Sequence, residues 1–325
     1  MTELRFDGRV AIVTGAGGGL GRRHALLLAA RGAKVVVNDI GGSVTGDGTD
    51  AGPAVAVVTE IRELGGEAIA DSSSVATAEG GAALVHAALS TYGRVDILVN
   101  NAGILRDTPF HALTPDLLDP VLDVHLRGAF HVTGPAWHAM REQGYGRVVN
   151  TTSAAGILGT AGKSNYGAAK AGLVGLTRVL AQEGAQHGIK VNAVAPIAAT
   201  RMLTHSVGET GGAADRQLAP AAREEMMDAI TGKLDPALVS PVVAFLGHED
   251  CPVTGETYTA GAGQVARFFT GRTRGYHHSA LSAEDVRDHL REIRDETGYT
   301  IPADPGEEIA QLLRAIAIRP DPADG

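Results

Sequence analysis

Residues 9–21 read RVAIVTGAGGGLG, and a helical stretch follows from Arg22 to Arg31. The apolar, β-branched run of residues 9–14 predicts a buried strand. The strand leads directly into the glycines, and a strand, a glycine-rich turn and a helix in this order are the context of a dinucleotide-binding turn. Glycines let the backbone approach a pyrophosphate, and the helix N-terminus offers it free N–H groups. We therefore interpret four residues of this turn as cofactor-binding: Gly15, Gly19, Leu20 and Gly21.

The next predicted strand, residues 34–39, ends in an acid. Asp39 stands eighteen residues after Gly21. A carboxylate at this place accepts hydrogen bonds from both ribose hydroxyls and repels a 2′-phosphate, so the sequence favours NAD over NADP as the cofactor. The alternative is that Asp39 only caps a loop or a helix.

The pattern of a strand followed by a helix continues along the chain. Short apolar runs predict further strands, and longer periodic stretches predict helices between them. Repeated alternation with right-handed crossovers predicts an α/β fold with one doubly wound parallel sheet. The expected strands are 67–71, 95–99, 147–153, 189–195 and 255–261, and the expected helices are 53–64, 79–92, 116–143 (interrupted by Pro120 and Pro135), 164–186 and 236–246.

Small or polar residues follow the carboxyl ends of several expected strands, where an open α/β sheet binds its ligands. Ser74 and Val75 come just after the third strand, and we expect them near the adenine. Asn101 and Gly103 follow the fourth strand. Ser153 ends the fifth strand, which would deliver its hydroxyl to the same edge of the sheet.

Tyr166 and Lys170 lie four residues apart on an expected helix, so their side chains share one face. A cation beside a phenol favours the phenolate and lowers the pKa of the tyrosine from its ordinary value of about 10. A tyrosine tuned in this way exchanges a proton with an alcohol or a ketone near neutral pH. By spacing alone, the pair is also compatible with an exposed amphipathic face. With Ser153 to hold the substrate oxygen, the catalytic residues are predicted as Ser153, Tyr166 and Lys170.

The composition of the 325 residues argues against several classes of protein. A net charge of −9 and a pI near 5.7 disfavour a nucleic-acid partner, and no apolar run reaches the length of a membrane span. The start, MTELRFDGRV, lacks the pattern of a secretory signal, and the final three residues are not the peroxisomal Ser-Lys-Leu address. The single cysteine, Cys251, fits a reducing compartment, so we expect a cytoplasmic protein. The pair His277-His278 lacks further ligands at metal-binding spacing and is expected on the surface, without a metal.

The chain is expected to divide into two parts after Gly263. Residues 1–263 would form one domain, in which residues 202–233 cover the substrate. Residues 264–325 would form a helical extension, with one helix starting at Ser282 and reaching about Asp295 and a second over 306–316. Such an extension is too short for a separate catalytic domain, so we expect it to pack on the domain or on a second subunit.

The motifs together resemble the short-chain dehydrogenase/reductase family over about residues 6–263. The resemblance rests on Thr14-Gly15-x-x-x-Gly19-x-Gly21, Asn101-Ala102-Gly103, Ser153 and Tyr166-x-x-x-Lys170. It implies a Rossmann-like subunit in a homodimer or homotetramer, with a nicotinamide dinucleotide as the sole cofactor. It also implies Tyr166 as acid and base, Lys170 as its partner and ribose contact, and Ser153 as the ligand of the substrate oxygen. Ala198 and Thr200 would contact the cofactor on the nicotinamide side.

A closer resemblance is to the (3R)-hydroxyacyl-CoA dehydrogenase group, which includes a portion of peroxisomal multifunctional enzyme type 2 and stand-alone bacterial relatives. The shared stretches include RFDGRV, VVVNDIGG, NNAGILRD, VHLRGAFHVT and YGRVVNTTSAAGI. Two positions depart from most of the wider family. His125 stands where most members have an Asn that holds a water for proton relay, and Ile197 follows Pro196 where most have a Gly. His125 therefore serves either the relay or the structure.

This resemblance implies an NAD-dependent oxidation of (3R)-hydroxyacyl-CoA to 3-ketoacyl-CoA in fatty-acid or sterol side-chain β-oxidation. The alternatives within enzymes are a 17β-hydroxysteroid dehydrogenase and a 3-oxoacyl-carrier-protein reductase. The reductase normally uses NADPH, which Asp39 disfavours. A nucleotide-sensing scaffold on the same fold is a further alternative, because fold alone does not decide function. The complete set of Ser153, Tyr166 and Lys170 disfavours it, since a sensor need not keep all three.

Overall fold

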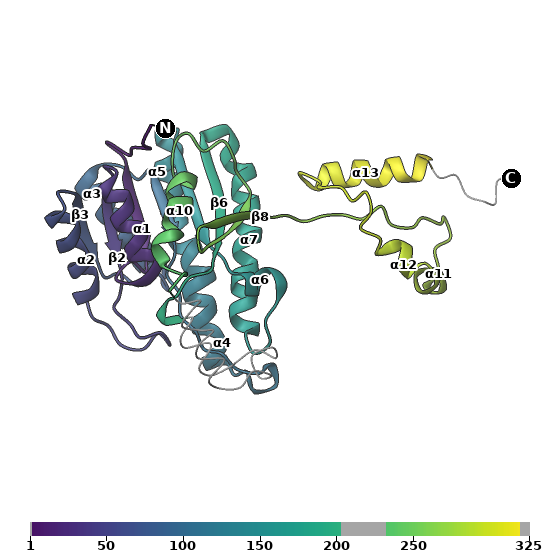
Figure 1. Ribbon diagram of the computed structural model, residues 1–325, viewed down its shortest axis with the longest axis horizontal. Coiled ribbons are helices and arrows are strands. Elements are labelled where there is room, and N and C mark those ends of the chain that lie inside the picture. Colours follow the sequence, from purple (N-terminus) through teal and green to yellow (C-terminus); the bar gives the residue numbers. More distant parts are fainter. Residues whose placement is uncertain (1, 203–231, 319–325) are drawn as a thin grey trace. The chain divides into compact units, whose positions relative to one another are not determined.

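The computed structural model describes residues 2–202 and 232–318, which fall into two compact units. The first unit is Met1–Arg267 and the second is Phe268–Gly325 (Figure 1). The segment predicted to cover the substrate, 202–233, lies outside the described residues except at its ends.

The first unit is built around one eight-stranded sheet (Figure 1), whose strands follow the order β3-β2-β1-β4-β5-β6-β7-β8. All neighbouring pairs from β3 to β7 are parallel. The order reverses between β1 and β4, where an open sheet forms its ligand crevice. The predicted doubly wound sheet is therefore confirmed. The strands are β1 (Val10–Thr14), β2 (Lys34–Asn38), β3 (Glu67–Asp71), β4 (Ile97–Asn100), β5 (Gly146–Thr151), β6 (Ile189–Pro196), β7 (Thr257–Gly261) and β8 (Gln264–Phe268).

Both faces of the sheet are covered by helices. In β1, Ala11 and Val13 belong to one hydrophobic core while Val10 and Ile12 belong to another, as the two-residue period of a strand requires. Burial on both faces explains why the strands read as continuous apolar runs. Helices α1 (Gly19–Ala30), α2 (Gly52–Glu63) and α10 (Ser240–Leu246) contribute to the first core, and α3 (Ala78–Tyr92), α5 (Gly128–Gln143) and α7 (Ser164–Gly184) contribute to the second. Shorter elements are α6 (Ala154–Leu158), η1 (Phe110–Ala112), η3 (Ala185–His187) and η5 (Pro236–Leu238).

The sheet extends one strand further than the sequence predicts. Residues 264–268, expected in the extension, form β8 beside β7. Only Ala262 and Gly263 connect the two strands, so they form an antiparallel hairpin, because a parallel pair needs a long crossover. Both connecting residues have positive φ, +50° and +79°, as a two-residue hairpin turn requires. The first unit ends at Arg267, one residue before the end of β8.

The helical region predicted for residues 116–143 passes through both of its prolines. It consists of α4 (Pro115–Leu122), the π-helical turn η2 (Asp123–Arg127) and α5. Pro120 has no N–H to offer the carbonyl of Asp116, and the Arg106 guanidinium donates to that carbonyl at 2.7 Å instead. The predicted interruption at the prolines is wrong: the irregular turn lies between them, and it carries the buried side chain of His125.

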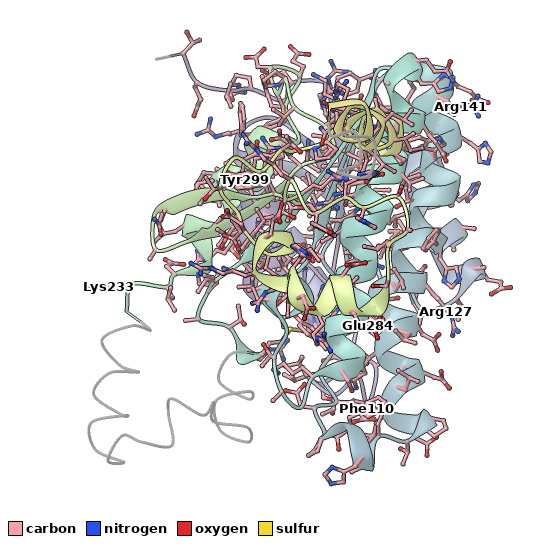
Figure 2. The ribbon with its side chains drawn as sticks, turned by 90° about the vertical axis from the view of Figure 1, so that its right-hand side faces the viewer. Phe110, Arg127, Arg141, Lys233, Glu284 and Tyr299 are labelled. Carbon is pink, nitrogen blue, oxygen red and sulfur yellow. The ribbon has the colours of Figure 1, made fainter. Side chains whose placement is uncertain are left out.

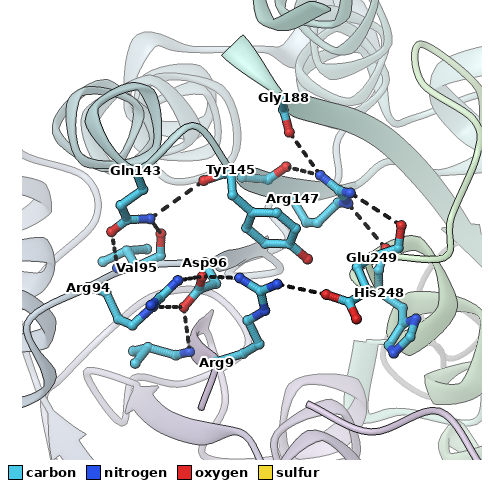
Figure 3. A network of polar contacts seen from close by, with 12 residues as sticks. Arg9, Arg94, Val95, Asp96, Gln143, Tyr145, Arg147, Gly188, His248 and Glu249 are labelled. Atoms are coloured by element: carbon cyan, nitrogen blue, oxygen red, sulfur yellow. Dashed lines mark hydrogen bonds and ion pairs between the residues drawn. The ribbon is translucent and has the colours of Figure 1, made fainter. Parts of the chain in front are cut away.

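A buried carboxylate joins the amino ends of three strands (Figure 3). Asp96 is fully buried, and it accepts hydrogen bonds from the Val10 amide at 2.9 Å and from the guanidinium groups of Arg9 and Arg94 at 3.1 and 2.7 Å. The ring of Tyr145 contacts the guanidinium groups of Arg9 and Arg147, with carbon-to-centroid distances of 3.9 and 4.4 Å. These contacts hold the edge of the sheet that lies away from the ligand crevice.

The second unit contains α11 (Ala283–Asp288), α12 (Leu290–Ile293) and α13 (Pro305–Ile318). The predicted helix start is confirmed by a capping box between Ser282 and Asp285, but the helix breaks at His289 instead of running on to Asp295. Among residues 268–314 no side chain is buried, and Glu284 and Tyr299 are two of the exposed ones (Figure 2). The pair His277-His278 is partly exposed in this unit.

Candidate active site

A cavity of about 490 Å³ opens at the carboxyl ends of β1, β4, β5 and β6. The predicted site residues come from segments far apart in the chain, and the fold brings them to this one space. Gly21 alone among them does not line it. The predicted residues that do are Gly15, Gly19, Leu20, Asp39, Ser74, Val75, Asn101, Gly103, Ser153, Tyr166, Lys170, Ala198 and Thr200.

The glycine-rich turn is shaped by close backbone contacts. A Cβ on Gly15 would lie 2.7 Å from Ala102 Cα, and a Cβ on Gly21 would lie 2.3 Å from the carbonyl oxygen of Gly15. Gly21 therefore makes the turn possible without reaching the cavity. Gly18, which precedes α1, offers no side-chain cap. The first N–H groups of this helix remain suited to an anionic ligand, so the turn fits a pyrophosphate.

Asp39 is tied to the same turn. Its Oδ2 accepts a hydrogen bond from the Gly17 amide and its Oδ1 accepts one from the Gly41 amide, both at 2.7 Å. A Cβ on Gly17 would lie 2.8 Å from the carboxylate oxygen, so glycine is needed there. The carboxylate is thus fixed at the wall of the cavity, where a ribose would accompany a pyrophosphate at the turn.

The loop that follows β2 lines the cavity, which the sequence did not indicate. Val44 and Gly46 belong to the lining. The Leu105 amide donates to the Val44 carbonyl and Arg106 Nε donates to the Thr45 carbonyl, each at 2.9 Å. The loop that follows β2 is therefore held against the segment that follows β4.

Arg201 lines the cavity together with Ala198 and Thr200. Its guanidinium lines the cavity and lies 3.6 Å from the position of a Cβ on Gly18. None of the hydrogen bonds and ion pairs found among the described residues involves Arg201. A guanidinium beside the N-terminus of α1 suits a phosphate, which it can bind through two N–H groups.

The three predicted catalytic residues converge at the ends of β5 and α7. Ser153 precedes α6, and its hydroxyl accepts a hydrogen bond from the Ala155 amide at 3.2 Å. Lys170 donates through Nζ to the Thr151 carbonyl at 2.5 Å, and Nζ lies 5.6 Å from the centroid of the Tyr166 ring. The arrangement places a phenol beside a hydroxyl and an ammonium, as expected for acid–base chemistry on an alcohol.

The electrostatics of Tyr166 differ from the sequence-based prediction. Burial raises the pKa of Tyr166 above its usual 10.0, the hydrogen bond with Ser153 lowers it, and the Asp107 carboxylate raises it. Burial also lowers the pKa of Lys170 from 10.5 to about 7. The prediction that Lys170 brings the tyrosine below its ordinary pKa is wrong for the chain by itself, because desolvation disfavours the charged form of both groups.

His125 lies against the catalytic tyrosine. Its Nε2 is 2.8 Å from the Ile104 carbonyl and 3.0 Å from the Ile104 amide, and its Nδ1 is buried without a partner among the described residues. Gly103 leaves the space for this ring, since a Cβ there would lie 2.3 Å from His125 Cε1. The unpartnered nitrogen belongs to a residue that lines the cavity.

Two further classes of site find no support in the described part of the chain. Residues 2–202 and 232–318 contain no group of three or more His, Cys, Asp or Glu residues that could hold a metal ion. None of the helices in the same ranges is both long and apolar enough to cross a membrane.

Several known proteins are similar to this chain in sequence. The family model for short chain dehydrogenases matches residues 9–210. A putative short-chain type dehydrogenase/reductase of Mycobacterium tuberculosis is 48% identical over 296 residues, which cover 90% of this chain and 96% of that protein. The peroxisomal multifunctional enzyme type 2 of Mus musculus is 44% identical over 298 residues, which cover 90% of this chain and 38% of the enzyme.

A solved structure extends the similarity to three dimensions. The full-length peroxisomal multifunctional enzyme type 2 of Drosophila melanogaster superimposes with a TM-score of 0.77 and 36% identity. The match covers 97% of this chain and 50% of that one. The chain thus spans half or less of these two multifunctional enzymes.

Proposed function

The chain belongs to the short chain dehydrogenase family, and from this we propose that it is an NAD-dependent oxidoreductase that oxidises (3R)-hydroxyacyl-CoA to 3-ketoacyl-CoA. One observation carries the proposal: Ser153, Tyr166 and Lys170 line the same cavity as the glycine-rich turn and Asp39. A site that exchanges a proton with an alcohol and a site that suits a dinucleotide share one space. Hydride transfer between an alcohol and a nicotinamide dinucleotide requires that both bind in one space.

The chemistry divides between the cofactor and the chain. A bound nicotinamide supplies the hydride acceptor. The Ser153 hydroxyl orients the substrate oxygen by a hydrogen bond, and Tyr166 takes the proton from the substrate hydroxyl as general base. Lys170 stays in place through its hydrogen bond to the Thr151 carbonyl, and a protonated Lys170 would favour the phenolate form of the tyrosine against the opposing effect of burial.

Asp39 supports NAD as the cofactor. The cavity residues next to it in the chain, Asn38, Ile40, Gly42 and Ser43, carry no positive charge to bind a 2′-phosphate. We expect kcat/KM to be at least about 100-fold higher with NAD than with NADP, because the carboxylate would repel the extra phosphate. Asp39→Asn should narrow this ratio, since it removes the charge at nearly constant shape. A clear preference for NADP in the unaltered protein would refute the assignment.

The acyl-CoA substrate is proposed from the resemblance of NNAGILRD and YGRVVNTTSAAGI to the hydroxyacyl-CoA dehydrogenase group. Similarity to multifunctional enzymes over most of this chain supports the same choice. A 17β-hydroxysteroid and a 3-oxoacyl-carrier protein are the alternative substrates.

We also infer a homodimer or homotetramer in the cytoplasm, in which the second unit packs on the first or on a neighbouring subunit. Light scattering of the intact chain and of a chain ending at Arg267 tests the assembly.

The deciding experiment is a screen for NADH formation. It compares (3R)- and (3S)-hydroxyacyl-CoA esters of several chain lengths with a 17β-hydroxysteroid, using Tyr166→Phe as the matched control. We expect turnover of the (3R) esters in the unaltered protein and its loss in the variant, with NAD binding retained. Activity confined to the (3S) esters or to the steroid would overturn the proposed substrate, and normal turnover by Tyr166→Phe would overturn the mechanism.

A further inference from the structure

A buried ion pair lies beside the catalytic tyrosine. Asp107 and Lys163 are joined through Oδ2 and Nζ, and their side chains are 1% and 11% exposed. Lys163 lines the cavity, and its Nζ is 5.7 Å from the centroid of the Tyr166 ring. The second carboxylate oxygen of Asp107 is buried without a partner among the described residues. The only cation at hydrogen-bond distance from this carboxylate is therefore, within the described part of the chain, Lys163.

The two segments that carry the pair are fastened together. The Thr108 amide donates to the Gly162 carbonyl at 2.9 Å, and Thr108 and Lys163 form a parallel bridge. Asn165 Nδ2 donates to the Arg106 carbonyl at 2.8 Å, while its Oδ1 accepts from the Tyr166 amide at 2.7 Å. The position of the ion pair relative to the tyrosine is thus set by the backbone on both sides.

Two lysines and one carboxylate lie around Tyr166. Lys170 and Lys163 face its ring at 5.6 and 5.7 Å, and Asp107 adds a negative charge beside Lys163. His125 meets the ring at 5.2 Å, but burial lowers its pKa well below 6.5, so it contributes no charge near neutral pH. Because the pKa of Lys170 is about 7, that ammonium is only partly charged under the same conditions. The net field on the phenol then depends on whether the Asp107 charge is compensated.

We propose that Asp107 and Lys163 act as one positioning unit, in which the lysine cancels a buried carboxylate that would otherwise oppose deprotonation of Tyr166. The pair keeps the tyrosine usable as a base while Asp107 holds the Lys163 ammonium at the wall of the cavity. This inference rests on the proposed acid–base role of Tyr166. Asp107 and Lys163 are not among the three predicted catalytic residues. Among the described charged groups near the ring, they are the two that still lack an assigned role.

Four proteins test the proposal: Lys163→Gln, Asp107→Asn, the double variant and the control Lys34→Gln. Lys34 makes an exposed pair with Glu67 at the start of β2, away from the cavity, so its substitution removes the same charge elsewhere. The measurement is the acid-side midpoint of kcat/KM against pH for alcohol oxidation. We expect Lys163→Gln to raise this midpoint by roughly one pH unit and Asp107→Asn to lower it. The double variant should return close to the unaltered protein, and the control should not move.

A structural role alone would change the melting temperature or the rate equally at all pH values and leave the midpoints in place. Unmoved midpoints in folded single variants, or a double variant as displaced as Lys163→Gln, would overturn the proposal. A second readout does not need a substrate: the absorbance of tyrosinate, taken as the difference between each protein and its Tyr166→Phe counterpart. If no hydroxyacyl-CoA is turned over, the proposed function fails, and this titration still decides the role of the pair by the same directions of shift.

Discussion

The imidazole of His125 meets the ring of Tyr166 edge to face, with the ring centroids 5.2 Å apart and the planes at 88°. Its Nε2 is occupied by the backbone of Ile104, and its Nδ1 is buried and unpartnered among the described residues. A neutral imidazole has one donor and one acceptor nitrogen. The geometry therefore leaves Nδ1 as the one nitrogen of this ring that is open to a further hydrogen-bond partner.

Substitution of His125 separates relay from packing. His125→Phe keeps an aromatic ring against Tyr166 but removes both nitrogens, and His125→Asn keeps polar atoms in a smaller side chain. We expect kcat to fall by roughly ten- to a hundredfold in His125→Phe, with less loss in His125→Asn and an unchanged Kd for NAD. Equal losses in the two variants would reduce His125 to a packing residue.

Lys170 should make the stability of the protein depend on pH. The unfolded chain keeps this lysine protonated up to its usual pKa of 10.5, whereas burial lowers the folded pKa to about 7. Between these values the unfolded chain binds more protons, so the contribution of this residue to stability rises with pH through that window. Lys170→Met removes the penalty, and its effect on the free energy of unfolding should be more favourable at pH 6 than at pH 10 by on the order of 2–4 kcal/mol.

Urea denaturation at the two pH values measures this difference. Lys34→Met serves as the control, because Lys34 is an exposed partner of Glu67. An effect of Lys170→Met that is the same at both pH values would contradict the lowered pKa. The variant should also lose turnover. Gained stability together with lost turnover would mean that the protein keeps this buried lysine for catalysis although it destabilises the fold.

Arg201 should contribute to the affinity for the diphosphate part of the cofactor. Its guanidinium lies near Gly18 at the N-terminus of α1, so Arg201→Gln should weaken binding of NAD and of ADP-ribose by roughly tenfold. Adenosine, which has no phosphate, should bind the variant and the unaltered protein alike. Calorimetric titration measures all three. Arg141, exposed at the end of α5 (Figure 2), provides the control Arg141→Gln, and a loss shared by adenosine would remove the phosphate assignment.

Asp96 should stabilise the fold without taking part in catalysis. Asp96→Asn leaves Arg9 and Arg94 facing a neutral side chain in a buried place, and we expect a loss of about 3 kcal/mol in the free energy of unfolding. Because the network lies at the amino ends of the strands, kcat/KM of the folded variant should stay unchanged (Figure 3). The exposed pair of Asp7 with Arg5 offers Asp7→Asn as a control. An unaltered urea midpoint in Asp96→Asn would contradict the importance of this network.

The parts of the fold that follow from local pattern were predictable from the sequence. The third strand was expected at 67–71 and forms over those residues, and the glycine-rich turn has the backbone contacts that its glycines suggested. β8 was not predictable in the same way. Its residues are all exposed or half-buried, so they lack the apolar alternation of a strand with one buried face, and they pair because β7 leaves an edge beside them.

The residues that form the site could be predicted from the sequence, but their pKa shifts could not. Ser153, Tyr166 and Lys170 were identified from spacing, and the cavity brings them together. The shift in the pKa of Tyr166 depends on how deeply the side chain is buried, and no spacing encodes that. Lys163 and Asp107 lie 56 positions apart, so their contact arises only when the chain folds.

Asp39 accepts hydrogen bonds from the amides of Gly17 and Gly41 with its two oxygens and also lines the cavity. One side chain thus holds the turn together and, in the function proposed above, would also discriminate between the two coenzymes. Evolution towards NADP would have to replace the hydrogen bonds of Asp39 to Gly17 and Gly41 at the same time as it introduced a positive charge. Single-step laboratory selection for that exchange should therefore return poorly folded or weakly binding intermediates, and successful lineages should carry compensating changes in both glycine segments.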